Sequence, residues 1–260
     1  AIAAELNSQK RLLKVAGSSG RNDNVNVTVK STGSRLAFAS LLGGSGDDFS
    51  TSLAVDGAGG IYLAGTTNSP DLAASPGPQP GYAGGTCGAL ASTFPCFDAF
   101  VAKVAPDGAA LDYLTYLGGT GGDYAYGIAV DLLGRATVAG STTSQDFPVT
   151  FGAFQITGGG NDVEAFVTRL DPAGHTLVYS TYLGGSGNAD VAYGVAVDSA
   201  GKAYVVGTTN SATGIATAGA HDTTLSGTDG FLVKIDPTVS GASSRVFGTY
   251  VGGNLTDEAY

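Results

Sequence analysis

Four aspartates stand at equivalent points of the chain, each four or five residues after a Gly-Gly pair: Asp48, Asp123, Asp190 and Asp257. Carboxylate and backbone oxygens suit Ca²⁺, so these groups are weak candidates for a calcium site if the fold gathers them around one axis. The alternative is that each carboxylate accepts hydrogen bonds from its own glycine-rich loop. This second interpretation is simpler and is favoured.

Aromatic residues accompany two of these aspartates. Phe49 follows Asp48 directly, and Tyr124 and Tyr126 follow Asp123. Aromatic rings beside paired acids suit the binding or the cleavage of sugars, although each ring fits a protein core equally well. A carbohydrate-binding or carbohydrate-cleaving protein is therefore one hypothesis for the chain.

Other catalytic signatures are missing from the sequence. It contains no G-x-S-x-G nucleophile elbow, zinc signature or phosphate-binding loop. His175 and His221 fall at different points of the repeat and predict no catalytic dyad. We assign no catalytic residue and no cofactor other than a possible Ca²⁺, and the sequence favours a protein without enzyme activity.

The elements that position these residues are repeats. The phrase Leu-Gly-Gly, written Val-Gly-Gly in the last copy, closes at Gly44, Gly119, Gly185 and Gly253, in steps of 75, 66 and 68 residues. Each step carries four short segments rich in β-branched and aromatic residues, of the types GIAVD, AYVVGTT, DGFLVKIDP and LVYSTYLGG. This pattern predicts an all-β fold, a β-propeller of four-stranded antiparallel blades. A linear β-solenoid is the alternative, but its coils are shorter.

The phase of the repeats predicts four blades in a single domain or segment, at about 1–48, 49–123, 124–190 and 191–260. The first unit is degenerate, with strands expected at 13–17, 25–29 and 38–42. The units either close a small ring of four blades or form part of a larger ring, and larger rings are commoner. An open segment would leave exposed sheet faces and edges that need a partner.

Composition and charge exclude several classes of protein. The net charge is −10 and no cluster of Lys or Arg occurs, which argues against nucleic acid and against anionic membrane surfaces. No apolar run reaches the roughly 18 residues of a membrane span. With 42 glycines and 13% charged residues, the composition suits a rigid secreted protein. The chain has no Met and begins and ends at one point of the repeat, so we expect a processed or excised segment.

The two cysteines, Cys87 and Cys96, lie in an insertion at 77–96 that is specific to one unit. They predict a disulfide that stabilises the loop by about 2 to 3 kcal/mol and indicate an oxidising compartment. Asn26 and Asn254 head two weak glycosylation sequons.

Two further sets of charged residues recur. One set is predicted to open tight turns, each with a glycine three residues later: Asp56, Asp131 and Asp198. The other set is predicted to be structural cations of the third strand, either exposed or paired: Lys103, Arg169 and Lys234.

The repeated text resembles the SBBP family of bacterial and archaeal β-propeller repeats. The resemblance is strong from Leu36 onward, and departures are the insertion at 77–96 and Leu72 where the next unit has Phe147. It implies a surface or secreted protein, often multidomain, without shared catalytic chemistry. Residues that carry it include Leu117, Gly118, Gly119, Asp123, Asp131, Gly140, Thr142, Phe147, Pro148, Phe166, Asp171, Gly174, Tyr179 and Tyr182.

The connections divide between two faces if the strands run up and down. The short first-to-second and third-to-fourth turns share one face, here called the turn face. The variable second-to-third loops and the loops after each Gly-Gly pair share the opposite face, the loop face, which is the expected binding face. The leading hypothesis is an extracellular or cell-surface structural and interaction module, with protein partners or self-assembly, including filaments.

Overall fold

The computed structural model describes residues 5–7, 12–14, 30–31, 35–36, 40–72, 74–89, 92–159, 163–187, 189–253, 256–257 and 259–260. Its largest elements are three four-stranded antiparallel sheets, which confirm the predicted all-β blades. The first sheet contains β5 (Asp48–Val55), β6 (Ile61–Thr67), β9 (Asp98–Val104) and β10 (Leu111–Leu117). The second contains β11 (Asp123–Val130), β12 (Ala136–Thr142), β13 (Glu164–Leu170) and β14 (Leu177–Leu183). The third contains β15 (Asp190–Val197), β16 (Ala203–Thr209), β17 (Asp229–Ile235) and β18 (Arg245–Val251).

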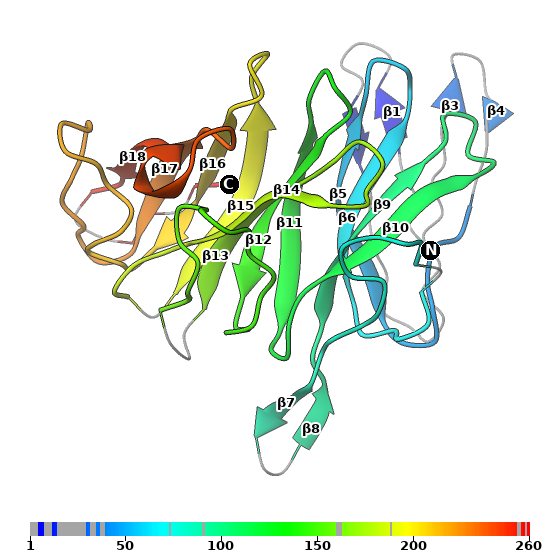
Figure 1. The fold of residues 1–260 in the computed structure, drawn as a ribbon, viewed down its shortest axis with the longest axis horizontal. Coiled ribbons are helices and arrows are strands. Elements are labelled where there is room, and N and C mark those ends of the chain that lie inside the picture. The colour runs from blue at the N-terminus through cyan, green and yellow to red at the C-terminus, as the bar shows by residue number, and fades with distance from the viewer. Residues whose placement is uncertain are drawn as a thin grey trace.

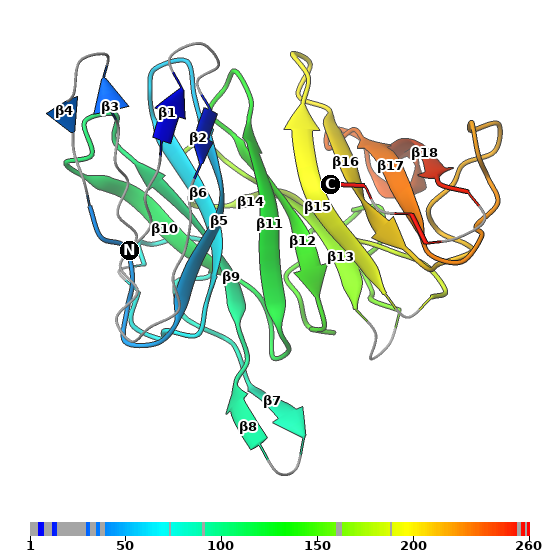
Figure 2. The ribbon, with the colours of Figure 1, turned by 180° about the vertical axis from the view of Figure 1, so that it is seen from behind.

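The three sheets fan out side by side, with β5, β11 and β15 as the inner strands and β10, β14 and β18 as the outer ones (Figures 1 and 2). Each sheet is a meander in chain order from the inner to the outer strand, which is the blade topology of a propeller. The described sheets form an open arc and do not close into a ring.

The described strands of the first unit differ from expectation. Its described strands pair only in twos, β1 (Glu5–Asn7) with β2 (Leu12–Lys14) and β3 (Lys30–Ser31) with β4 (Arg35–Leu36). β2 overlaps the strand expected at 13–17, the strand expected at 25–29 lies outside the described residues, and residues 40–42 are not strand.

The turn face is built as the sequence predicts. In the β5–β6 turn, Asp56 Oδ1 accepts hydrogen bonds from the backbone nitrogens of Ala58 and Gly60, at 2.9 and 2.8 Å. Gly59 has a φ of 88°, a conformation that glycine adopts without strain. Asp131 and Asp198 make equivalent bonds in the next two blades, which confirms the turn role.

Each sheet packs one face on its neighbour. Tyr62, Val101 and Tyr113 of the first sheet pack on Val138 and Phe166 of the second in one buried cluster. A second cluster joins the second and third sheets in the same way, with Ala139, Ala165, Val167, Tyr179 and Leu183 against Ala203, Val205, Phe231, Val233 and Ile235. The core therefore lies between sheets, and side chains on both faces of a middle blade are apolar.

The second-to-third loops are fixed to the outer strand of their own blade. In the second sheet the Tyr182 hydroxyl donates to Ser144 O at 2.8 Å and accepts from the backbone nitrogen of Phe147 at 3.2 Å. Tyr116 bonds Ser69 O and the Leu72 nitrogen in the first sheet, at 2.8 and 3.0 Å. In both sheets the tyrosine two residues before the Gly-Gly pair thus holds the loop that lies across its strand.

The insertion forms a hairpin of β7 (Thr86–Ala89) and β8 (Ser92–Pro95), which projects from the loop face (Figure 1). Cys87 and Cys96 are joined by the expected disulfide, with their Cα atoms 4.9 Å apart. The described part of the chain has one short 3₁₀ turn, η1 (Gly241–Ser244), and no helix with the length and hydropathy of a membrane span.

Candidate functional site

The loop face holds most of the residues that sequence reasoning selected. Asp48, Asp123 and Asp190 begin the inner strands of three successive blades, and all three are buried. Asp257 precedes Tyr260 at the edge of the third sheet, where Tyr260 contacts Tyr193 of β15 (Figure 2).

Each of these aspartates accepts hydrogen bonds from its own loop. Asp123 Oδ2 accepts from the backbone nitrogen of Gly119 at 2.8 Å and from Ser144 Oγ at 2.7 Å. Asp48 is bonded in the same way by Gly44 and Ser69, at 2.8 and 3.0 Å. The carboxylate thereby joins the Gly-Gly loop to the Ser that follows the second strand, as the simpler interpretation of these residues expects.

Asp190 follows the same pattern, and Asp257 shares the bond from the glycine nitrogen. Asp190 Oδ2 accepts from the Gly185 nitrogen at 3.1 Å and from Ser211 Oγ at 2.8 Å. Asp257 Oδ2 accepts from the Gly253 nitrogen at 2.7 Å. The four aspartates lie on successive blades and are not brought together, and among the residues described no three acidic, histidine or cysteine side chains converge on one metal position.

A second set of acids, which sequence reasoning missed, faces the first set. Asp98, Glu164 and Asp229 begin the third strands and are buried. A Cβ placed on Gly118 would lie 2.9 Å from Asp98 Oδ1 and 2.7 Å from Asp123 Oδ2, so both carboxylates close on the first glycine of the Leu-Gly-Gly phrase. The signal was present, because an acid opens every copy of the DGFLVKIDP-type segment.

Burial disfavours the charged form of both carboxyl groups. Burial, reinforced by the charge of Asp123, raises the pKa of Asp98 to about 7. Burial also raises the pKa of Asp123 to about 6. Because desolvation dominates at both residues, ionising the pair without a counter-ion is costly.

Backbone hydrogen bonds between neighbouring blades are made by the same aspartates. The nitrogen of Asp123 donates to Phe97 O of the preceding blade at 2.6 Å, and the nitrogen of Asp190 donates to Val163 O at 2.8 Å. The nitrogen of Asp257 donates to Thr228 O at 2.8 Å. Residue 257 thus takes, on the third sheet, the position that an inner strand takes on the first two.

The aromatic candidates form two separate rows. Phe97 lies between Phe49 and Tyr124, with ring centroids 6.0 Å from each. Tyr126 belongs to a second row with Tyr193 and Tyr260, at centroid spacings of 5.5 and 5.0 Å. The structure therefore joins Phe49 to Tyr124 and separates both from Tyr126.

Bulges in the inner strands explain the second row. The register of β11 against β12 shifts between Ala125 and Gly127, which leaves Tyr126 unpaired, and β15 shifts in the same way at Tyr193. A bulge turns one extra side chain out of the ladder. Equivalent tyrosines can therefore contact one another from blade to blade.

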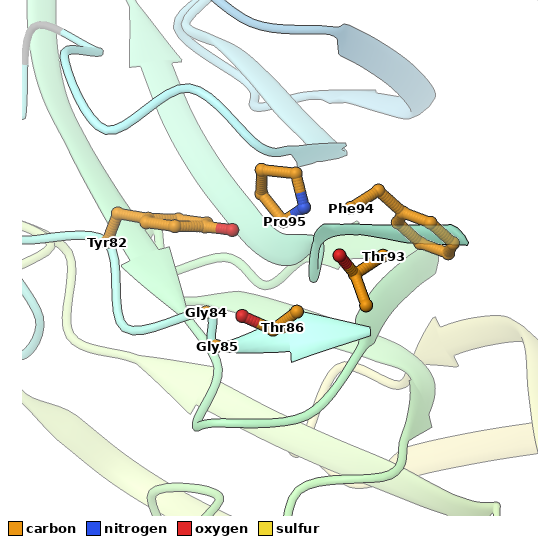
Figure 3. A pocket seen from close by; sticks show the side chains of 7 residues that line it. All are labelled: Tyr82, Gly84, Gly85, Thr86, Thr93, Phe94 and Pro95. Carbon is orange, nitrogen blue, oxygen red and sulfur yellow. The ribbon is translucent and has the colours of Figure 1, made fainter. Parts of the chain in front are cut away.

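The hairpin of the insertion borders a hollow of about 250 Å³ on the loop face, lined by Tyr82, Gly84, Gly85, Thr86, Thr93, Phe94 and Pro95. Figure 3 shows the rings of Tyr82 and Phe94 at opposite ends, with the hydroxyls of Thr86 and Thr93 between them. The Tyr82 hydroxyl donates to Cys96 O, next to the disulfide. The hollow therefore offers aromatic and hydroxyl groups without a charge.

The recurrent third-strand cations lie toward the turn face. Lys103 pairs with Asp112 at 3.8 Å and Lys234 with Asp198 at 3.7 Å. Arg169 is buried, and it donates to Thr137 Oγ1 at 2.9 Å and to Gly201 O at 2.5 Å. Lys103 and Lys234 are paired as expected, whereas Arg169 is buried and donates to neutral oxygens. Asn26 and Asn254, the sequon residues, lie outside the described residues.

Comparison with known protein families finds a match to the repeats of the chain. A family model described as a β-propeller repeat, SBBP, matches residues 38–72, 112–148 and 178–214. The second and third matches run from β10 and β14, the outer strands, across the following Gly-Gly loop into the first two strands of the next blade, and the first match covers the Gly-Gly loop at 43–44 with β5 and β6. No curated protein matches the chain.

Proposed function

Because the chain is built from SBBP β-propeller repeats, we propose that it is a non-catalytic module of the cell exterior that works by binding proteins, first of all a second copy of itself. The observation that carries this proposal is the outward face of the third sheet. Support for the cell exterior comes from the disulfide, since such bonds persist in oxidising compartments.

The outward face of the third sheet presents residues that other blades bury. Val206 and Leu232 are half-buried there, and Val251 is 50% exposed. Their equivalents in the second sheet, Ala139, Val167 and Leu183, are at most 1% exposed because the third sheet covers them.

The last described residues of the chain, 256–257 and 259–260, lie against the third sheet. Asp257 makes the inter-blade backbone bond, and Tyr260 extends the tyrosine row of Tyr126 and Tyr193. Continuity with the two interfaces inside the chain therefore supports a sheet of the same kind as the occupant, which a second copy can supply. Heterologous contacts of this type propagate when they do not close.

Charge on the outward face of the third sheet should abolish association. We expect the purified chain to increase in mass with concentration in light scattering, and Leu232→Glu to remain monomeric because a buried carboxylate would have no partner. Leu133→Glu, at a 66% exposed position of the turn face, is the control and should associate like the parent. A parent chain that stays monomeric at high concentration would overturn the proposal.

A carbohydrate-binding role is the second candidate, and the hollow beside the hairpin favours it. Rings pack on the apolar faces of sugars while hydroxyls bond their edges, which the pairing of Tyr82 and Phe94 with two threonines allows. On an array of neutral oligosaccharides we expect binding that Phe94→Ala weakens at least tenfold. Phe151→Ala, at a fully exposed ring of another loop, should bind like the parent. An array without any bound sugar would exclude this role.

A further inference from the structure

Charge is divided unequally between the two faces of the described sheets. The four ion pairs found among the described residues all lie at the turn face: Lys103–Asp112, Arg135–Asp131, Lys202–Asp236 and Lys234–Asp198. The loop face carries acids that none of these pairs includes: Asp47, Asp48, Asp71, Asp98, Asp123, Asp146, Asp190, Asp222, Asp229 and Asp257. A field of this sign concentrates cations at the loop face.

The junction of the first and second sheets contains a buried oxygen without a partner. Asp98 is fully buried, and its Oδ2 accepts from the Ala83 nitrogen at 2.8 Å and from Gln79 Nε2 at 3.2 Å. Its Oδ1 has no hydrogen-bond partner and is directed at Gly118, beside Asp123 Oδ2. Burying a carboxylate oxygen without a hydrogen-bond partner destabilises the fold, because nothing replaces the water that it loses.

The groups around Gly118 are all oxygen ligands from different segments. Asp98 comes from the first sheet and Asp123 from the second, while Gln79 Oε1 from the loop accepts from the Gly118 nitrogen at 2.9 Å. Carboxylate, amide and backbone oxygens suit hard cations, and no histidine or cysteine lies among them to favour zinc.

We propose that the Asp98–Asp123 pair binds Ca²⁺ at the junction of the first two blades. The ion would neutralise two buried carboxylates that no Lys or Arg of the described sheets reaches, and it would tie one blade to the next. Asp229 holds the equivalent position at the start of the third strand of the third sheet, and its Oδ1 is buried, unpartnered and directed at Gly252.

Thermal unfolding of the full chain with Ca²⁺ and with chelator tests this proposal near neutral pH. We expect Tm to rise with Ca²⁺ concentration and calorimetry to detect binding of the metal alone. Asp98→Asn should raise Tm in chelator, because it removes the uncompensated charge, and should no longer respond to Ca²⁺. Asp47→Asn, which removes an exposed acid of the same face, should keep the full response.

Two results would overturn it. One is a Tm that Ca²⁺ leaves unchanged while acidification raises it, because the pair would then take up only a proton. The other is an Asp98→Asn variant that responds to Ca²⁺ as the parent does, because the ion would then bind elsewhere. Neither result bears on self-association, which the light-scattering experiment measures separately.

Discussion

Replacing Gly140 with alanine is expected to lower the free energy of unfolding by about 3 kcal/mol. Gly140 lies in β12, opposite Ala125 of the inner strand and Phe166 of the third strand. A Cβ at this position would lie well under 3 Å from Tyr124 O and 2.7 Å from the Phe166 ring. Because the first obstacle is backbone at the bulge and the second is a fully buried ring, neither can move cheaply.

The same contact recurs in each of the three described four-stranded sheets, so the same loss of stability is expected at the equivalent glycines. Gly65 faces Phe49 O and the Phe100 ring, and Gly207 faces Val191 O and the Phe231 ring. The glycine of the second strand is therefore the residue that allows the inner strand to bulge.

Urea unfolding of Gly140→Ala measures the loss, with Gly57→Ala as the control. A Cβ on Gly57 meets nothing within 4 Å, so that variant should unfold close to the parent. Equal stability of the two variants would mean that the bulge is not the reason for glycine in the second strand.

Much of the fold could be predicted because the repeats report on one another. The Leu-Gly-Gly phrase, the turn aspartates and the four segments rich in β-branched and aromatic residues each recur, and together they predicted the four-stranded blades and their two faces. Asp123 was identified with both of its possible roles, and the structure shows the hydrogen bonds from Gly119 and Ser144. The disulfide followed from two cysteines in one insertion.

The facing acids could not be derived from the same signals. In the sequence Asp98 only marks the start of a strand. The packing of neighbouring blades is what sets it against Asp123. The aromatic rows likewise depend on inter-blade geometry, since Phe97 links Phe49 to Tyr124 from outside the strands that carry them. Whether the ring closes depends on the sum of the angles between blades, so the sequence could not decide between a small closed ring and part of a larger one. The described sheets form an arc.

The stability of the metal-free chain is expected to fall as pH rises from about 4 to about 7. Burial raises the folded-state pKa of Asp98 from 3.8 to about 7, so in this range the folded chain holds a proton that the unfolded chain has released. Raising the pH therefore favours unfolding. Each tenfold difference in acid constant is worth about 1.4 kcal/mol, so the pKa change of Asp98 alone is worth about 4 kcal/mol, and that of Asp123 acts in the same direction.

An opposing effect appears only in stronger acid. Hydrogen bonds from Thr238 and Lys202 lower the pKa of Asp236 to about 2, so the stability that this carboxylate contributes is lost as pH falls below about 4. Between these limits the two effects leave a maximum of stability in mildly acidic solution, well below neutrality.

The variant Asp98→Asn distinguishes this origin of the pH dependence from a general effect of net charge. The amide retains the bond from the Ala83 nitrogen but cannot ionise, so the unfolding free energy measured in chelator should lose most of its slope between about pH 5 and about pH 7. Asp47→Asn changes the net charge equally and should keep the slope of the parent, because its carboxylate is exposed. If both variants keep that slope, the buried pair does not set the pH dependence; if both lose it, the cause is the summed charge of the loop face.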